Sequence, residues 1–259
     1  DKAWNEELGR IRVETEDTQA LKIFYTALYH AMTAPSLFCD VDGAYRGADG
    51  QTHTDPGHDT YTTFSLWDTY RATMPLYSIC QSERFEDFIR TMLDIHSQQG
   101  KLPVWHLMGC ETDCMVGNPG IPPVADAIMK GFDGFDHAEA FEAMKNSAMR
   151  PDRGQEHRMK YGYIPCDLFG ESVAYDLEYA LADGALAKAA EMLAENDEEN
   201  AEYYDAQAKY FRERSRSYRH LYDPELRFLR GKDSKGRFRK EYSPFASTHR
   251  ADDYCEGNG

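Results

Sequence analysis

The feature that most constrains the fold is a helical spacing of apolar residues along most of the 259-residue chain. From Asp17 to about Met32, apolar residues recur every three or four positions, and Pro35 ends the run. A plain solenoid of helix pairs would show a repeat of fixed length, which the sequence lacks. The same spacing predicts further helices over about 65–79, 82–100, 123–130, 138–149, 172–194 and 198–222.

The connections between these helices are unequal in length. Long connections at 34–62, 100–121 and 151–170 are rich in Gly, Pro, Asp and aromatic residues. Long loops cost conformational entropy and persist where they carry function, so we expect the functional side chains at the helix ends where these loops gather. This pattern is typical of a mainly α fold, the (α/α)6 toroid of helical hairpins. The chain holds about seven of the roughly dozen helices that such a ring needs, so the toroid is incompletely represented.

The composition excludes several classes of partner. The chain has 45 acidic and 29 basic residues and a net charge of -16, so nucleic acid and anionic membrane surfaces would be repelled, whereas neutral sugars would not. No apolar run approaches the roughly 18 to 20 residues that span a membrane, so we expect no membrane span. The six cysteines could be free thiols or disulfides, and the sequence leaves this open.

The segment 223–253 breaks the helical pattern. We expect a short hairpin or irregular crossover around Gly231 and Gly236. Its basic residues are predicted to form a solvated surface and not a nucleic-acid patch; they are Arg227, Arg230, Lys232, Lys235, Arg237, Arg239 and Lys240.

A candidate catalytic acid lies in the sequence GCETDCMVG at 109–117. Glu111 there is bounded by glycines and follows Pro103 and Trp105. Apolar and aromatic neighbours withdraw water from a carboxyl group and raise its pKa toward neutrality, as a general acid requires. We therefore predict that Glu111 is a general acid. A helix-capping or surface acid is the structural alternative.

Two metal-binding patterns are partly matched, a zinc site around Cys110 and a calcium loop at 40–50. His106, Cys110 and Cys114 lie four residues apart and could contribute to a zinc site, but a structural zinc site uses four ligands in short pairs and no second pair stands nearby. The sequence DVDGAYRGADG at 40–50 departs from the EF-hand pattern. We interpret it as a turn-rich loop in which Asp42 is a candidate for sugar contact.

Seven segments, in order along the chain, together resemble glycoside hydrolase family 92, the calcium-dependent, inverting exo-α-mannosidases. No single segment would be specific, but together they cover nearly the whole chain. They are IFYTALYHAMTAPSLFCDVDGAYRG at 23–47, WDTYR at 67–71, LPVW at 102–105, ETDCMVG at 111–117, KYGYIP at 160–165, GESVAYDLEYA at 170–180 and EGNG at 256–259.

The resemblance implies a mechanism with two carboxyl groups. Inverting glycosidases place them about 6.5 to 9.5 Å apart, one to protonate the leaving oxygen and one to activate water. Glu111 matches the family's general acid, and the general base belongs to a motif downstream of EGNG that this chain does not contain. The implied substrates are mannose-containing glycans, and the implied cofactor is calcium, which prefers hard oxygen ligands.

The resemblance also implies a substrate and metal site. Trp67 and Asp68 match a sugar-binding segment, in which the ring would form a wall of the pocket and the carboxylate would accept hydroxyl protons. Trp105 is expected to line the same pocket. Glu256 and Asn258 match the segment that faces the sugar and the metal, so Glu256 is predicted to bind substrate and Asn258 to bind the metal. The alternatives are a helix N-terminus for Glu256 and Asn258, a capping or salt-bridge residue for Asp68, and an ordinary core position for Trp105.

The domain organisation follows from the same resemblance. Residues 1–15 match the linker from an amino-terminal β-sandwich domain, and residues 16–259 match part of the catalytic domain. We expect residues 1–259 alone to be inactive without the remainder of the polypeptide, and the enzyme to be secreted, periplasmic or attached to the cell surface. A noncatalytic helical carbohydrate-binding or scaffold module and a toroidal glycosidase for another sugar are the alternatives, and the linkage preference stays open.

Overall fold

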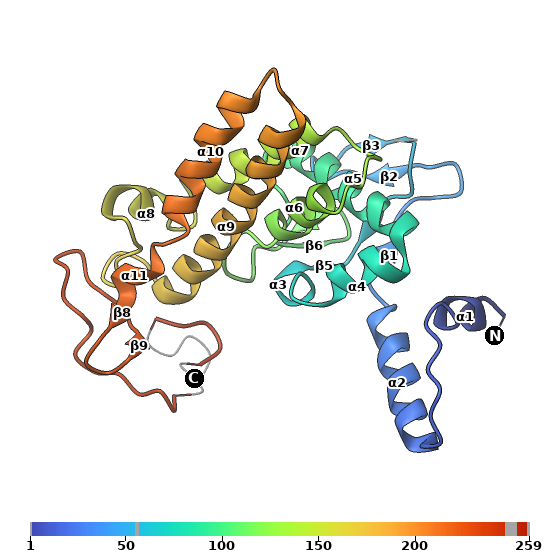
Figure 1. Ribbon diagram of the computed structural model, residues 1–259, viewed down its shortest axis with the longest axis horizontal. Helices are drawn as coiled ribbons and strands as arrows, with labels where there is room; N and C mark the ends of the chain where they lie inside the picture. Colours follow the sequence, from blue (N-terminus) through green and yellow to red (C-terminus); the bar gives the residue numbers. More distant parts are fainter. Residues whose placement is uncertain (1, 55–56, 247–252, 258–259) are drawn as a thin grey trace.

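The computed structural model describes residues 2–54, 57–246 and 253–257 (Figure 1). About half of the chain is helical, which confirms the mainly α prediction. The helices are α1 (Lys2–Leu8), α2 (Thr18–Ala31), α3 (Leu66–Thr69), α4 (Thr73–Cys80), α5 (Ser82–Gln99), α6 (Ile121–Met129), α7 (His137–Met149), α8 (Gln155–Tyr161), α9 (Ser172–Asn196), α10 (Ala201–Arg214) and α11 (Tyr218–Leu221).

The strands are short and all pair antiparallel. They form the pairs β1–β4, β2–β3 and β8–β9 and the three-stranded sheet β5–β6–β7. Their bounds are β1 (Ser36–Leu37), β2 (Tyr45–Arg46), β3 (Thr52–His53), β4 (Tyr61–Thr62), β5 (Phe64–Ser65), β6 (Trp105–Leu107), β7 (Cys110–Glu111), β8 (Tyr222–Asp223) and β9 (Phe228–Leu229).

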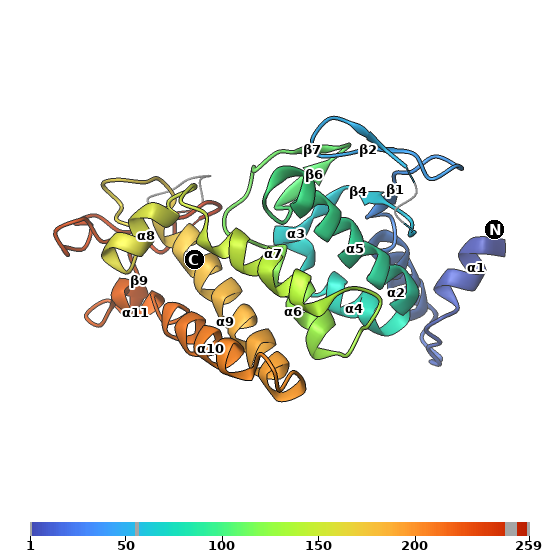
Figure 2. The ribbon, with the colours of Figure 1, turned by 90° about the horizontal axis from the view of Figure 1, so that it is seen from above.

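The longest helix, α9, lies at the centre of the helical packing. It runs alongside α10 on one side and packs against α6 and α7 on the other, and α5 packs against α4, α6 and α7 (Figure 2). The α1–α2 arm extends away from these helices, at the opposite side of the molecule from β8 and β9 (Figure 1). The described residues do not by themselves show a closed ring of helices, so the (α/α)6 toroid stays a prediction.

The apolar period of α5 shows how the sequence builds the main core. Phe85, Ile89 and Met92 are fully buried on one face of this helix, together with side chains from α4, α6, α7, α9 and α10. The helix ends at Gly100, whose φ of 79° is the left-handed conformation that commonly ends helices. The boundaries predicted for this helix are confirmed, because the period and its glycine stop are both local signals.

The helix predicted over 65–79 is interrupted, so its prediction as one continuous helix was wrong. It forms α3 and α4 with a break between them at 70–72. The Nε of Arg71 donates a hydrogen bond to the carbonyl of Trp67 at 3.0 Å, and a continuing helix would need that carbonyl for the Arg71 N–H. A side chain that takes the place of the backbone donor therefore accompanies the break.

The helix predicted over 198–222 is interrupted in the same way, between α10 and α11. The carbonyl of Arg214 accepts a hydrogen bond from the Arg158 guanidinium at 2.9 Å, although a continuing helix would use it for the N–H of Tyr218. The Arg158 donor comes from α8, which lies within the segment 151–170 that was predicted to be a loop. Glycines with positive φ stand at both ends of α8, at Gly154 and Gly162.

The segment 223–253 contains hairpins, as predicted, but its basic residues are not all solvated. β8 pairs with β9, and a second turn around Gly236 is closed by a bridge between Lys232 and Phe238. Arg230 is buried and forms an ion pair with Asp223. The prediction of a solvated basic surface was therefore wrong for Arg230. The charge pattern of the sequence does not show that Asp223 is buried beside Arg230 and neutralises it.

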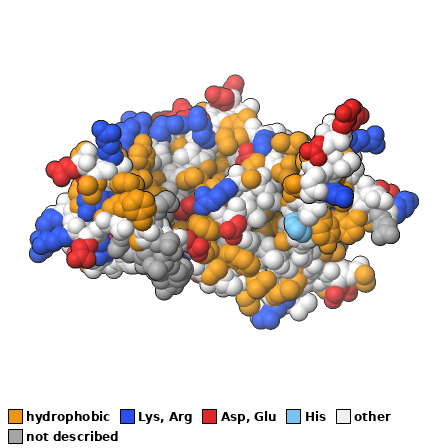
Figure 3. Space-filling model, turned by 90° about the horizontal axis from the view of Figure 1, so that it is seen from below, with side chains coloured by type: hydrophobic (Ala, Val, Ile, Leu, Met, Phe, Trp, Pro, Cys, Tyr) orange, Lys and Arg blue, Asp and Glu red, His pale blue; other side chains and the backbone are white. Residues whose placement is uncertain are grey.

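The surface of the molecule carries several uncovered apolar side chains. On the face drawn in Figure 3, apolar patches lie between charged residues. Exposed large apolar residues include Ile23 of α2, Ile79 of α4 and Leu181 of α9. All six cysteines are free thiols. Within the described residues, every helix is too short or too polar to cross a membrane.

Candidate functional site

Segments that lie far apart in the sequence meet in one apolar cluster beside the first turns of α9. Each of the quoted segments 67–71, 111–117, 160–165 and 170–180 contributes a member, and Cys255 joins them from the residue before EGNG. We name this group the motif cluster. Its buried members are Val116, Ile164, Ala174, Tyr175, Tyr179 and Cys255, and Trp67, Met115 and Phe169 pack against them.

Beside the motif cluster, hydrogen bonds between polar side chains connect the segment after α3 to α9. The Arg71 guanidinium lies over the Trp67 and Tyr70 rings, at 4.9 and 4.7 Å from their centroids. Glu178 accepts hydrogen bonds from Arg71 at 2.6 Å and from the Tyr70 hydroxyl at 2.8 Å. Burial and the Glu178 carboxylate raise the pKa of Tyr70, so its hydroxyl stays a donor. Neither Tyr70 nor Glu178 was predicted as a site residue, although both lie in the segments 67–71 and 170–180.

The two predicted sugar-binding residues of this region have different surroundings. Trp67 is half-buried, and its Nε1 is buried without a hydrogen-bond partner in the described part of the chain. Asp68 is exposed and accepts a hydrogen bond from the hydroxyl of Ser65. Trp67 therefore presents an unused N–H donor at the motif cluster, and Asp68 presents a carboxylate to solvent at the start of α3.

The sheet β5–β6–β7 places the predicted residues Trp105 and Glu111 next to α3. Met108 and Gly109 link β6 to β7, and both have positive φ, as a two-residue hairpin of type I′ requires. Trp105 lies opposite Ser65, the residue before α3. The hairpin thus brings the LPVW and ETDCM segments together and sets both beside the WDT segment.

The carboxylate of Glu111 is bound by the backbone of its own loop. It accepts hydrogen bonds from the N–H groups of Val104 at 2.8 Å, Trp105 at 2.9 Å and Asp113 at 3.0 Å. This setting differs from the apolar surroundings expected from the sequence, because the nearest groups are peptide donors. The geometry shows an anchor that fixes the loop from 103 to 113, and the catalytic role of Glu111 stays a prediction.

His106 is buried between this loop and the main core. It lies opposite Glu111 in the sheet, and neither ring nitrogen has a hydrogen-bond partner in the described residues. Burial lowers the pKa of His106, and the Glu111 carboxylate opposes this shift in part. Cys110 and Cys114 are exposed, and nowhere in the described ranges do three His, Cys, Asp or Glu side chains gather to hold a metal. The structure therefore gives the zinc alternative no support.

Replacing His106 by Leu should make the stability of the protein less dependent on pH. Because the pKa of His106 is lowered on folding, the unfolded chain binds this proton more tightly, and stability falls as the pH drops below about 6.5. Melting temperatures measured between pH 5 and pH 8 should fall less steeply toward acid in H106L than in wild type. H30L, which removes an exposed imidazole, is the control and should retain the wild-type slope. Identical slopes in wild type and H106L would contradict the prediction.

The last described segment places several carboxyl groups around a buried thiol. Burial raises the pKa of Cys255 to about 11, and the carboxylates of Glu171, Glu256 and Glu178 add to the effect. Glu256 is exposed, whereas Glu171 and Glu178 are partly buried. Asn258, the predicted metal ligand, lies outside the described residues. The structure therefore sets Glu256 at the solvent side of the motif cluster.

A calcium site is not completed by these side chains. No group of three His, Cys, Asp or Glu residues capable of holding a metal occurs within the described ranges. Glu256 has the hard oxygen ligands that calcium prefers, but calcium takes about six to eight such oxygens. The described acidic side chains alone do not complete a calcium site, and any calcium would need further oxygen ligands.

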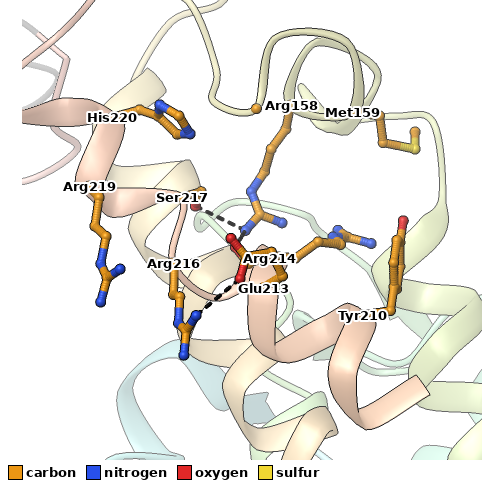
Figure 4. A pocket seen from close by; sticks show the side chains of 10 residues that line it. Arg158, Met159, Tyr210, Glu213, Arg214, Arg216, Ser217, Arg219 and His220 are labelled. Carbon is orange, nitrogen blue, oxygen red and sulfur yellow. Dashed lines mark hydrogen bonds and ion pairs between the residues drawn. The ribbon is translucent and has the colours of Figure 1, made fainter. Parts of the chain in front are cut away.

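A separate pocket of about 610 Å³ lies between α8, α10 and α11 (Figure 4). Arg158 and Arg214 line this pocket, but both form ion pairs with buried carboxylates. Arg158 pairs with Asp176 and Asp183 at 2.7 Å each, and Arg214 pairs with Asp183 at 3.2 Å. None of the predicted site residues lines this pocket. It is therefore distinct from the site that the sequence predicted.

The model of the glycosyl hydrolase family 92 catalytic domain matches residues 1–259, and the chain belongs to this family. No curated protein matches the chain.

Solved structures of mannosidases match almost the whole chain. The family GH92 α-mannosidase BT3965 from Bacteroides thetaiotaomicron, in complex with mannoimidazole, has 36% sequence identity and a TM-score of 0.90 over 99% of this chain and 33% of its own. The family GH92 inverting mannosidase BT2199 from Bacteroides thetaiotaomicron VPI-5482 has 30% identity and a TM-score of 0.87 over 99% of this chain and 34% of its own. The chain thus spans about a third of the length of these structures.

Proposed function

We propose that the polypeptide to which this chain belongs is an exo-acting α-mannosidase that releases terminal mannose from glycans with inversion. The observation that carries the proposal is the meeting of the family's sequence segments in the motif cluster. Membership of glycosyl hydrolase family 92 and the similarity to solved mannosidases support it. We further propose that the complete catalytic domain is an (α/α)6 toroid.

We propose Glu256 as the general acid, in place of Glu111, to which the family resemblance assigns this role. A proton donor must carry its proton on an oxygen that can reach the leaving group. Both oxygens of Glu111 already accept hydrogen bonds from the backbone N–H groups of its own loop. Glu256 is an exposed carboxyl group at the motif cluster. We therefore assign proton donation to Glu256 and the support of the 103–113 loop to Glu111.

The remaining groups follow from the chemistry of inversion. A second carboxyl group must activate water at about 6.5 to 9.5 Å from the acid, and we assign it to the polypeptide beyond residue 259. Trp67, whose Nε1 has no hydrogen-bond partner among the described residues, and Trp105 are proposed to line the sugar site, and Asp68 to accept hydroxyl protons. Residues 1–15 are proposed to link to a β-sandwich domain, and the enzyme to act in the periplasm, at the cell surface or outside the cell.

Removal of calcium should abolish activity of the full-length polypeptide. The family resemblance implies a calcium ion whose ligands include Asn258 and residues beyond this chain. Calcium accepts irregular coordination and sugar hydroxyls more readily than magnesium does. Hydrolysis of mannobiose should therefore stop after chelation and return with calcium more fully than with magnesium. Full activity after exhaustive chelation would refute the proposal, and recovery with zinc alone would restore the Cys and His alternative.

A panel of mannobioses of each linkage tests the function itself. Release of mannose from at least one of them by the full-length polypeptide is the expected result, and it would also define the linkage preference. Binding of mannose glycans without hydrolysis would favour the noncatalytic carbohydrate-binding or scaffold module. Hydrolysis of another sugar alone would favour a related glycosidase of different specificity.

A further inference from the structure

The side chain of Asp253 is held in a fixed plane by one arginine. It is 3% exposed, and Arg239 donates hydrogen bonds from Nε at 2.8 Å and from Nη2 at 2.7 Å to its two oxygens. A two-point contact between a guanidinium and a carboxylate fixes both distance and orientation. Asp253 therefore connects the last described segment to the segment around residue 239.

The backbone of Asp253 is held as well, by the N-terminus of α9. Its carbonyl accepts hydrogen bonds from the N–H groups of Val173 at 3.0 Å and Ala174 at 3.2 Å. The first N–H groups of a helix have no acceptor within the helix, and the N-cap side chain of Glu171 supplies none here. The carbonyl of Asp253 thus replaces the missing cap of α9.

Close contacts surround this segment. A Cβ atom on Gly231 would lie 1.7 Å from the Oδ2 of Asp253, so a larger residue at that position would displace this carboxylate. The backbone N–H of Arg239 bonds to the carbonyl of Gly231 at 2.8 Å, and the hydroxyl of Tyr254 bonds to the carbonyl of Leu229 at 2.7 Å. The segment is therefore packed between α9 and the turn from 229 to 239.

We propose that Asp253 is a positioning residue that fixes the location of Glu256 at the motif cluster. The side chain of Asp253 bonds to Arg239, and its carbonyl caps α9. These two contacts fix the backbone two residues before Cys255, which packs in the motif cluster, and three residues before Glu256. The proposal rests on the role of Glu256 in the proposed function. Displacement of a catalytic group by about 1 Å can cost roughly a hundredfold in rate, which is why such a clamp matters.

The test uses the full-length polypeptide with the variants D253N, E256Q and D253N/E256Q. D253N should lower kcat on mannobiose about 10- to 100-fold with KM nearly unchanged, and should lower it less on an aryl mannoside with a good leaving group. In the E256Q background it should cost almost nothing further, because the two residues act through one step. A full additional loss in that background, or a change in KM alone, would overturn the proposal.

Two further variants separate positioning from general loss of structure. R239K keeps the charge but loses the two-point contact, so its kcat should fall between wild type and R239Q. D233N removes an Asp–Arg pair of the same region, that of Asp233 with Arg237, and should behave as wild type. Equal losses in D233N and D253N would show that the region is merely fragile.

A measurement that does not depend on activity distinguishes the two proposals. Cys255 follows the clamp and is buried, so D253N should speed its labelling by a maleimide at least tenfold, as read by peptide mass spectrometry, and D233N should not. If E256Q is fully active but D253N speeds labelling, the clamp stands and the assignment of the acid has failed. Unchanged labelling in D253N would overturn the clamp.

Discussion

The E256Q variant of the full-length polypeptide should lose roughly two to four orders of magnitude in turnover of mannobiose. Glutamine preserves the shape of the side chain but has no acidic proton for the leaving oxygen. An aryl mannoside with a good leaving group needs little protonation, so its turnover should fall much less. The ratio of the two losses, measured as kcat on each substrate, identifies the general acid.

E111Q is the matched variant, because it makes the same change at the other candidate. The amide has one carbonyl oxygen, so it cannot accept all three backbone hydrogen bonds that Glu111 accepts. We expect a loss that is similar on both substrates and a lower melting temperature, since the 103–113 loop is loosened. A loss confined to mannobiose in E111Q, with E256Q near wild type, would return the acid to Glu111 as the family resemblance implies.

Replacement of Arg158 by Met should strongly destabilise the packing of α8 on α9 and α10. Arg158 bonds to Asp176 and Asp183 at 2.7 Å each and to Ser217 at 3.1 Å, and all of these groups are buried. Removing one partner of a buried ion pair costs about 3 to 5 kcal/mol, because the other charge is left without compensation. Amides of α9 that exchange by global unfolding should then exchange roughly 10²- to 10⁴-fold faster, as followed by hydrogen exchange and mass spectrometry.

Two variants test the cause of this destabilisation. R158M/D176N should recover part of the loss, because burial already raises the pKa of Asp176 and an amide leaves no charge in the interior. R216M removes an exposed arginine that pairs with Glu213 at 3.1 Å, and it should change exchange little, since exposed pairs contribute about 0 to 1 kcal/mol. Similar exchange in R158M and wild type would mean that the network contributes little to stability.

The local parts of the fold could be predicted from the sequence. The apolar period and the glycine stop defined α5, and Asp17 caps α2 where the period predicted its start, by accepting the N–H groups of Gln19 and Ala20. These signals are local because a helix forms between residues three and four positions apart. The ordered segments that resemble glycosyl hydrolase family 92 also indicated the family correctly.

The sequence could not predict where long polar side chains bind. Arg71 and Arg158 donate to backbone carbonyls and accompany helix breaks that the apolar period does not show. Arg230 looked like a surface residue until its carboxylate partner was located. The setting of Glu111 depends on a hairpin that turns its carboxylate back onto Val104 and Trp105, and apolar neighbours in sequence did not reveal this.

The sequence by itself determined most of the long helices, the glycine that ends α5 and the family, because each of these depends on residues that are close together or in a fixed order. Only the tertiary structure decided which carboxylates are anchors and which face solvent. Glu178 meets Arg71 across 107 positions, and Asp253 reaches the first turn of α9 from the other end of the described chain. Contacts of this kind depend on the packing of whole helices, so the chemistry of a single acid becomes clear only once its neighbours in space are known.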